Sequence, residues 1–414
     1  MHSEPQIWFQ LTLLLLIAVI SHFIIGKMRQ PMVVGEILIG MLIGPSVIGF
    51  TLIDVNLVST FAQFGSIVLL FMIGLESDLK SIYTKRNMSI AIGGVVVPWV
   101  MGFLVFMVIM PDAGMTQAIF IGATLVATSV AVTASVLMEL KMIKKPVGQA
   151  ILGAAVIDDI LGMVILAIAG GTAGGGIDML EILYLIAAAI GFVIIGIWAG
   201  TRYLCRILEA ADREAKDRGL EHTGFVMALM IALFYAYIAE VIGISAIVGA
   251  FVAGTVFSSL YIKKEFERGT KYLGAIFIPV FFISLGILFD VSGLADFIWI
   301  AIIITIVAVV SKMIGCAIPA LVYGMSARES VAVGIGMTPR LEVALIIALY
   351  GLSTGIIGPD VYSMVVFMGL VTALITPPIF RAILRRSSDS GGANSWSSPH
   401  LKKGKMMGKR GPRI

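Results

Sequence analysis

Thirteen apolar stretches, each long enough to cross a lipid bilayer, constrain this chain more than any other feature of its sequence. A membrane-spanning helix needs about 20 predominantly apolar residues. Of the 414 residues, 59% are hydrophobic and only 13% are charged, whereas a soluble domain has about 25% charged residues. The sequence therefore predicts an all-α polytopic membrane protein in a lipid bilayer. The predicted spans are 6–26, 32–50, 57–77, 88–110, 116–139, 147–170, 179–205, 221–242, 244–261, 271–289, 296–323, 328–351 and 360–384.

The lysine and arginine residues give an independent test of this count, because they concentrate in cytoplasmic loops. Of 29 such residues, 27 lie in the carboxyl-terminal tail or in alternate loops and helix ends. The opposite loops carry only acids, such as Asp112 and Asp360. The alternation favours thirteen spans in the cell membrane, with the amino terminus outside and the carboxyl terminus in the cytoplasm.

Several classes of protein are excluded by what the sequence lacks. The two cysteines, Cys205 and Cys316, cannot form a disulfide framework or a cysteine-based metal site. The four histidines have no metal-ligand spacing, and neither a P-loop nor a dinucleotide-binding motif is present. We therefore expect no cofactor, no nucleic-acid partner and no enzymatic activity.

The chain resembles itself at an offset of about 213 residues. The segment 34–40 matches 248–254, and the pattern Gly-x-x-x-Asp occurs at both 74–78 and 286–290. The matching spans differ by seven, an odd number, so the two copies have opposite orientations in the membrane. We predict two inverted six-helix repeats joined by the seventh span, an arrangement typical of secondary transporters.

Two spans, at equivalent places in the two repeats, have sequences that favour a broken helix. Residues 122–135 are dense in β-branched and hydroxyl side chains. In the segment 334–342, Pro339 removes a helical hydrogen bond and clashes with the preceding turn. We predict discontinuous helices that cross at mid-depth, where freed carbonyl groups can coordinate a cation.

Two adjacent aspartates, Asp158 and Asp159, lie half-way along the sixth span. One aspartate at that depth costs about 2.5–3.5 kcal/mol on insertion scales, so a pair calls for a function. Successive helical positions point about 100° apart, so one carboxylate can face a partner while the other faces a cavity. A carboxyl group that alternates between protonated and ionised forms can exchange a proton for a metal cation.

Two cations also fall inside apolar spans. Lys312 needs a counter-charge, and Asp158 or Asp159 is the natural one. Arg340 and Glu342 are predicted to form a structural charge clamp, either by neutralising each other or by bridging to two other acids, Glu36 or Glu76.

These motifs together give the chain a clear resemblance to a known family. From about residue 8 to 384 it resembles the bacterial and archaeal monovalent cation:proton antiporters, specifically the NapA-like sodium/proton antiporters with the NhaA/NapA-like fold. The motifs that carry the resemblance are Gln30-Pro31-x-x-Val34-Gly35-Glu36 with Gly44-Pro45, Ala127-Thr128-Ser129, Ile157-Asp158-Asp159, Lys312, and Pro339-Arg340-x-Glu342-Val343-Ala344.

The resemblance implies roles for individual residues. Asp159 would be the main carboxylate ligand shared by Na⁺ and protons, and Asp158 would pair with Lys312 when the cation is absent. Thr128 and Ser129 would line the site. The resemblance further implies electrogenic exchange of two protons per sodium ion by an elevator movement.

A division into domains and a homodimeric assembly follow from the same resemblance. A dimerisation and scaffold domain, a moving core, a connector helix and a disordered cytoplasmic tail would together make up the chain. Their ranges are 6–77 with 221–289 for the scaffold, 88–170 with 296–384 for the core, 179–205 for the connector and 385–414 for the tail, within a membrane domain of residues 1–384.

The sequence leaves other functions open. Exchange of K⁺ for protons is the alternative, although potassium-efflux relatives typically carry Gln-Asp where this chain has Asp158 and Asp159. An intramembrane aspartyl protease needs facing carboxylates from two helices, which neighbours on one helix do not provide. An open channel does not account for the inverted repeat, the paired aspartates and the buried lysine together.

Overall fold

The computed structural model describes residues 4–28, 31–44, 55–82, 84–173, 179–220, 222–287 and 297–389. Over these ranges the chain is helical and contains no β-strand. The tail 390–414 lies outside the described residues, as do the motif positions Gln30, Pro45 and Asp290. The all-α prediction is confirmed.

The helices follow the apolar pattern of the sequence. Their bounds are α1 (Glu4–Met28), α2 (Met32–Ile43), α3 (Val55–Glu76), α4 (Leu79–Ile82), α5 (Lys85–Ile109), α6 (Gly114–Val126), α7 (Val130–Glu139), α8 (Pro146–Ala173), α9 (Met179–Ala199), α10 (Cys205–Asp217), α11 (Thr223–Ile242), α12 (Ala246–Phe257), α13 (Lys263–Ile287), α14 (Ile298–Val322), α15 (Ala327–Gly336), α16 (Glu342–Ser353) and α17 (Pro359–Asp389). A 3₁₀ turn, Pro111–Ala113, precedes α6, and a π turn, Gly200–Leu204, joins α9 to α10.

Eight apolar helical stretches in the described ranges are long enough to cross a membrane. They coincide with eight of the thirteen predicted spans. Shorter apolar helices coincide with the other five, at Trp8–Ile24, Met32–Ile43, Thr60–Glu76, Ala246–Phe257 and Val343–Leu352. The pattern of apolar helices therefore follows the sequence, and eight of them meet the length needed for a crossing.

The break predicted within the span 328–351 is present, because the backbone of Met337–Leu341 is not helical around Pro339. Two predicted boundaries differ from the structure. The seventh span does not end near 205, since the helix continues through the π turn into α10. The carboxyl-terminal helix α17 extends to Asp389, so the predicted disordered tail begins at least five residues too early.

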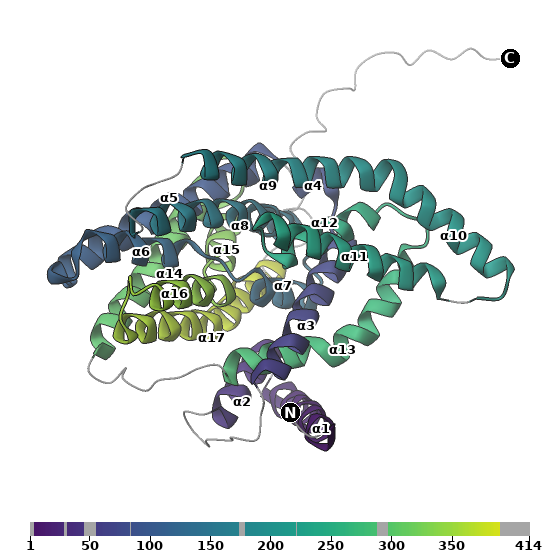
Figure 1. Cartoon of the computed structure of the whole chain (residues 1–414), viewed down its shortest axis with the longest axis horizontal. Helices are drawn as coiled ribbons and strands as arrows, with labels where there is room; N and C mark the ends of the chain where they lie inside the picture. Colours follow the sequence, from purple (N-terminus) through teal and green to yellow (C-terminus); the bar gives the residue numbers. More distant parts are fainter. Residues whose placement is uncertain are drawn as a thin grey trace, which may run out of the picture.

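The helices form two packed groups. The first contains α2, α3, α11, α12 and α13, and the second contains α5, α6, α8, α14, α15, α16 and α17. Figure 1 shows the second group on the left and the first on the right and below, with α9 running across the top. Helix α7 packs against α3 and α2 of the first group and against α8 and α17 of the second, so it lies between them.

Glycines allow the helices of the first group to approach closely. A Cβ at Gly40 of α2 would collide with the backbone of α13 near Gly286, and a Cβ at Gly74 of α3 would collide with the backbone of α12 near Gly254. Small residues at such contacts let helix backbones touch, which is the usual packing of membrane helices.

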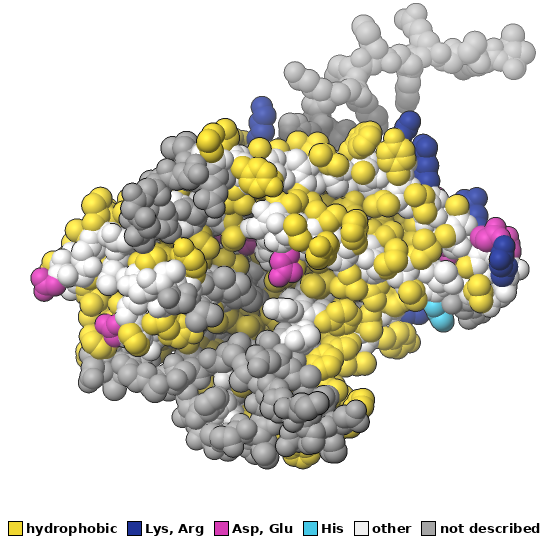
Figure 2. Space-filling view, viewed as in Figure 1, with side chains coloured by type: hydrophobic (Ala, Val, Ile, Leu, Met, Phe, Trp, Pro, Cys, Tyr) yellow, Lys and Arg dark blue, Asp and Glu magenta, His cyan; other side chains and the backbone are white. Residues whose placement is uncertain are grey.

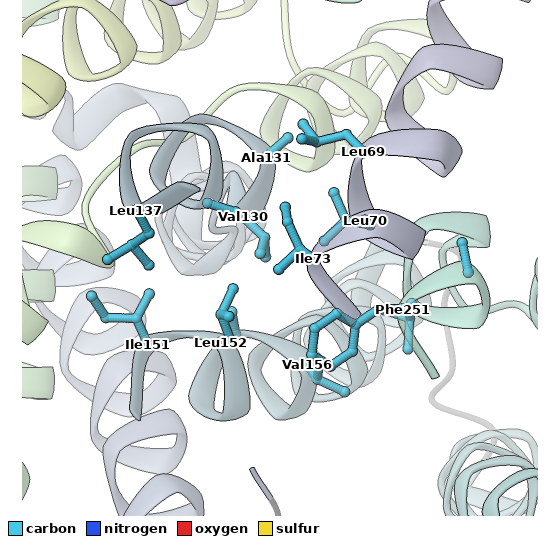
Figure 3. Packing of buried hydrophobic residues seen from close by; sticks show 14 of the residues in the cluster. Leu69, Leu70, Ile73, Val130, Ala131, Leu137, Ile151, Leu152, Val156 and Phe251 are labelled. Atoms are coloured by element: carbon cyan, nitrogen blue, oxygen red, sulfur yellow. The ribbon is translucent and has the colours of Figure 1, made fainter. Parts of the chain in front are cut away.

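Buried side chains from several helices join the two groups. Figure 3 shows residues of α3, α7, α8 and α12 that pack around one centre, among them Leu69, Ile73, Val130, Ile151 and Phe251. Outward-facing side chains are also apolar, as Leu183, Ile194 and Val226 show with exposed fractions of 61%. Figure 2 shows hydrophobic side chains over much of the visible surface, with most of the visible lysine and arginine side chains toward the right. An apolar outer surface is expected of a protein that faces lipid.

Candidate functional site

A fully buried ion pair lies at the centre of the second group. Lys312 Nζ of α14 lies 2.7 Å from Asp158 Oδ1 of α8, and neither side chain is exposed. The ammonium group also donates hydrogen bonds of 2.8 Å to the carbonyl oxygens of Gly94 and Val126. A lysine has three donors, and here each one has an acceptor. Full satisfaction of this kind is what makes a buried charge tolerable.

The packing of α5 against α14 explains how Lys312 reaches these acceptors. A Cβ at Gly93 would collide with the carbonyl oxygen of Gly315, so the two helices touch through their backbones. A Cβ at Gly94 would crowd Cys316 and the end of the Lys312 side chain. The two glycines therefore leave room for a lysine between helices in close contact.

The two broken helices predicted from the sequence are present, and their breaks touch. Helix α6 ends at Val126 and α7 begins at Val130, while α15 ends at Gly336 and α16 begins at Glu342. The Ser129 N–H donates to Pro339 O at 2.6 Å, so a backbone group of each break is hydrogen-bonded by the other. The carbonyl of Val126, freed by the first break, is one of the acceptors of the Lys312 ammonium group.

A second hydrogen bond ties the helix after the first break to the end of α15. The Thr133 hydroxyl donates to Gly336 O at 2.5 Å. Together with the bond from Ser129, it fixes the register in which the two broken helices cross.

Oxygen atoms around this crossing lack hydrogen-bond partners in the described part of the chain. Ser129 Oγ and Asp158 Oδ2 are both buried and unpaired there. Thr128 is close enough to Asp158 to interact with it electrostatically, but its hydroxyl completes no hydrogen bond to Oδ2 and lies 3.5 Å from Met337 O. Asp159, at the next position of α8, is also buried, with 7% exposed. Hydroxyl, carbonyl and carboxylate oxygens together are the ligand types of a small hard cation.

Arg340 lies in the second break and is fully buried. Its backbone N–H donates to Thr372 Oγ1 at 3.1 Å, and its Nη1 donates to Thr338 O at 3.3 Å. Its charge acts on Asp158 through space. Glu342 begins α16, but its side chain is not among those described.

The other predicted members of the charge clamp lie elsewhere. Glu76 and Glu36 line a cavity of about 680 Å³. Glu36 pairs there with His22 at 3.1 Å, instead of with Arg340. The cavity lining does not include Arg340 and is His22, Met32, Glu36, Met72, Glu76, Ser135, Met138, Glu139, Lys141, Ile143, Lys144, Lys271, Gly274, Ala275, Ile278 and Pro279. The structure thus separates Arg340 from the acids at the ends of α2 and α3.

Several residues of the site have no signal in the sequence. The acceptors from Gly94 and Val126 are backbone carbonyls, which any residue would supply. Thr133 and Thr372 resemble the many other threonines of apolar helices until the fold brings them to the breaks. The proline and the charged residues were conspicuous, and the family resemblance indicated Thr128 and Ser129, whereas the other neutral groups were not visible in the sequence.

The fold has solved counterparts. The sodium proton antiporter MjNhaP1 from Methanocaldococcus jannaschii superposes with a TM-score of 0.66, over 91% of this chain and 96% of that one. The two sequences are 14% identical, so this likeness concerns the fold alone.

The sequence also has curated relatives and a family. The Na⁺/H⁺-K⁺ antiporter GerN of Bacillus cereus is 35% identical over 384 residues, covering 91% of this chain and 96% of its own length. The Na⁺/H⁺ antiporter of Enterococcus hirae is 33% identical over 381 residues, covering 91% and 97%. The family described as sodium/hydrogen exchanger, transmembrane, matches residues 12–386. The chain belongs to this sodium/hydrogen exchanger family, and so to the cation:proton antiporter superfamily that its motifs indicated.

Proposed function

We propose that this protein is an electrogenic secondary antiporter that exchanges Na⁺ or Li⁺ for protons. The observation that carries the proposal is the buried Asp158–Lys312 pair beside the crossed breaks, with Asp159 at the next helical position. The printed names of its relatives agree, since GerN and the Enterococcus hirae protein are both named Na⁺/H⁺ antiporters. An aspartate pair in the membrane is expensive and is typical of proton and ion pathways.

In the proposed cycle, one set of carboxylates serves protons and the cation in turn. Asp159 gives up its proton when Na⁺ binds and becomes the main ligand. The unpaired oxygens of Ser129 and Asp158, with Thr128, complete the cation's shell. Binding draws Asp158 away from Lys312, so the cation and the ammonium compete for one carboxylate. Two protons would move for each sodium ion, one released by Asp159 and the second by the Lys312 ammonium group once Asp158 has left it.

The arrangement of the helices supports the finer details of this proposal. If the chain is an inverted repeat with an offset of about 213, Gly40 corresponds to Gly254 and Gly74 to Gly286. The repeat then maps the contact between Gly40 and Gly286 onto the contact between Gly254 and Gly74, and both contacts are present. A two-fold axis requires such a pair of equivalent contacts. This supports thirteen spans, two inverted six-helix repeats and the NhaA/NapA-like fold.

The two packed groups support an elevator movement. The group of α2, α3 and α11–α13 matches the predicted scaffold, through which a homodimer would form, and the group around α8 and α14 matches the predicted moving core. The cavity lined by Glu36, Glu76, Lys141 and Lys144 has α7 on one side and α3 and α13 on the other. It would give the cation access from the lysine-rich side, which we assign to the cytoplasm, in a plasma membrane with the amino terminus outside.

Exchange of K⁺ for protons is the second candidate, because the name of GerN includes K⁺. It uses the same site with a different ligand geometry. Proton flux in proteoliposomes separates the two candidates: an internal pH dye reports on addition of Na⁺, Li⁺ or K⁺. Asp159→Asn is the control for leakage.

Three outcomes of that experiment are informative. A Na⁺ or Li⁺ response that accelerates when valinomycin and equal K⁺ clamp the potential supports electrogenic exchange. A response to K⁺ alone, measured without valinomycin, replaces Na⁺ with K⁺ in the proposal. If none of the three ions drives proton movement, or if flux is undiminished in Asp159→Asn, the proposed antiport is contradicted.

A further inference from the structure

A second cavity, of about 660 Å³, is lined mostly by apolar side chains. It is a groove between α5, α8, α9 and the residue that follows α14. Its lining is Thr84, Lys85, Met88, Ser89, Val156, Ile157, Ile160, Leu161, Val164, Ile186, Ile190, Val193, Ile194 and Tyr323. The volume falls within the roughly 300–1,000 Å³ of sites that bind small molecules.

The polar residues of this groove gather at one end. Thr84 and Lys85 begin α5, and Tyr323 follows the last residue of α14. The Ser89 hydroxyl donates to the Tyr323 hydroxyl at 3.1 Å, and Lys85 is exposed. A lysine, hydroxyl groups and a helix amino terminus at one mouth form a site complementary to a phosphate group.

The apolar remainder has the length and the opening of a site for an acyl chain. From Val156 to Val164, α8 rises about 12 Å, close to the roughly 15 Å of hydrocarbon in one leaflet. On α9, Ile190 is 51% exposed and Ile194 is 61% exposed. Helix α9 packs its other side on α11 and α12, where the Tyr235 hydroxyl donates to Gly196 O at 2.7 Å. Because Ile190 and Ile194 line the groove and are exposed, the groove is open toward the surrounding membrane.

We propose that this groove binds an anionic phospholipid, with its phosphate at Lys85 and one acyl chain between α8 and α9. The separation of one charged end from an apolar slot matches a single phospholipid standing in its leaflet. An apolar peptide helix or a second copy of the chain would leave the lysine without a counter-charge. Basic pockets between membrane helices on the cytoplasmic side are suited to anionic headgroups.

The position of the groove gives the bound lipid a route to the ion site. Ile157 and Ile160 line it and flank Asp158 and Asp159 on α8. The lipid would thus bear on the same helical turn that carries both carboxylates. Lipid binding itself does not rest on the proposed transport function, whereas an effect on transport does.

Photoactivatable lipids test the binding directly. The protein is reconstituted in phosphatidylcholine vesicles that contain a trace of phosphatidylglycerol with a diazirine in its acyl chain, and labelled peptides are mapped. We expect labelling within 156–164 and 186–194, about fivefold stronger than with diazirine phosphatidylcholine. One basic residue near a membrane surface contributes about 1 kcal/mol to the binding of an anionic lipid, which corresponds to this ratio. Equal labelling by the two lipids, or labelling spread evenly over the lipid-facing helices, would overturn the proposal.

Two pairs of matched variants locate the headgroup and the chain. Lys85→Gln should remove the preference for phosphatidylglycerol, while Lys264→Gln, also in the first turn of a helix and exposed, should keep it. Ile194→Trp should fill the groove and lower labelling, while Ile195→Trp, on the same helix, 62% exposed and not in the lining, should not. The proposal fails if the members of either pair behave alike.

Inorganic phosphate distinguishes a lipid from a free anion. Millimolar phosphate should leave the labelling unchanged, because the acyl chain supplies most of the binding. Displacement of the lipid by phosphate, combined with no effect of Ile194→Trp, would assign the site to a free anion and overturn the lipid. Because the readout is crosslinking, these results stand whether or not the protein exchanges sodium for protons.

Discussion

The two broken helices cross in the same way but satisfy their polar groups differently. In the second break, Thr338 donates its hydroxyl to Ile335 O at 2.6 Å, and the Arg340 N–H has Thr372 as its acceptor. In the first break, the freed Val126 carbonyl accepts from Lys312, and the Ser129 hydroxyl has no partner among the described residues. In the second break these two groups find partners within its own half of the chain, whereas the Ser129 oxygen of the first break is left for the cation that we propose.

If the chain is the inverted repeat that we propose, this difference would leave the ion site on one side only. At the proposed offset of 213 residues, Thr372 of α17 corresponds to Asp159 of α8. The first half thus has an acid where the second has a neutral hydroxyl that binds the backbone of Arg340. Arg340 is buried in the second break, while the Asp158–Lys312 pair lies beside the first.

The largest expected effect is on transport in Asp159→Asn. Asparagine keeps the volume but cannot release a proton, so sodium-driven proton flux should fall to the level of empty vesicles. Thr372→Val, at the position that the proposed repeat makes equivalent, should retain most of the flux. Proteoliposome assays at equal protein content measure both. Comparable losses in the two variants would mean that the halves do not differ as we propose.

Next in size is the effect of Asp158→Asn on stability. The change leaves the Lys312 ammonium buried without a counter-charge, and breaking a buried pair costs about 3–5 kcal/mol. Thermal unfolding in detergent should show a clear loss for this variant and for Lys312→Gln. The double variant Asp158→Asn with Lys312→Met should recover much of the loss, because it buries no charge. If the double variant is less stable than either single one, the pair is not the source of the effect.

The sequence predicts the charged groups of this site better than the neutral ones, and the reason is physical. An aspartate or lysine inside an apolar span is costly enough to stand out, so Asp158 and Lys312 were visible as candidate partners. The break at Pro339 was visible for a similar reason, since the ring cannot sit in a continuous helix. The carbonyl of Gly94 and the hydroxyl of Thr372 acquire their roles only through tertiary contacts.

Helix ends are harder to predict. Apolar composition locates each helix only approximately, so the continuation of the seventh span through the π turn into α10 was missed. A bridge from Arg340 to Glu36, one of the alternatives for the charge clamp, was suggested by charge alone. In the fold, α1 brings His22 to Glu36, and the spacing of these residues along the chain does not predict that pair.

The third effect is smaller and concerns Thr372→Val. Valine removes the acceptor of the buried Arg340 N–H and the hydroxyl that donates to Gly369 O at 2.9 Å. An orphaned buried donor costs about 1–3 kcal/mol, so the melting temperature should fall while the half-saturating Na⁺ concentration stays near that of wild type. Thr372→Ser, which keeps the hydroxyl, is the control. A raised half-saturating concentration with unchanged stability would move the cation site toward the second break.

The smallest effect on stability is expected for Ser129→Ala, and it sharpens the comparison most. The Ser129 hydroxyl is buried and has no hydrogen-bond partner in the described part of the chain, so its removal orphans nothing and should change stability by less than about 0.5 kcal/mol. If this oxygen is a ligand, the half-saturating Na⁺ concentration should rise about three- to tenfold, the value of one hydrogen bond or ligand contact. Ser284→Ala is the matched control, because the buried Ser284 hydroxyl of α13 donates to Phe281 O at 2.6 Å and lies outside both breaks. This variant should lose stability and leave the Na⁺ dependence of transport unchanged. If Ser129→Ala changes neither the stability nor the half-saturating Na⁺ concentration, the Ser129 oxygen is not a ligand, and Thr128 and the carboxylates alone would bind the cation.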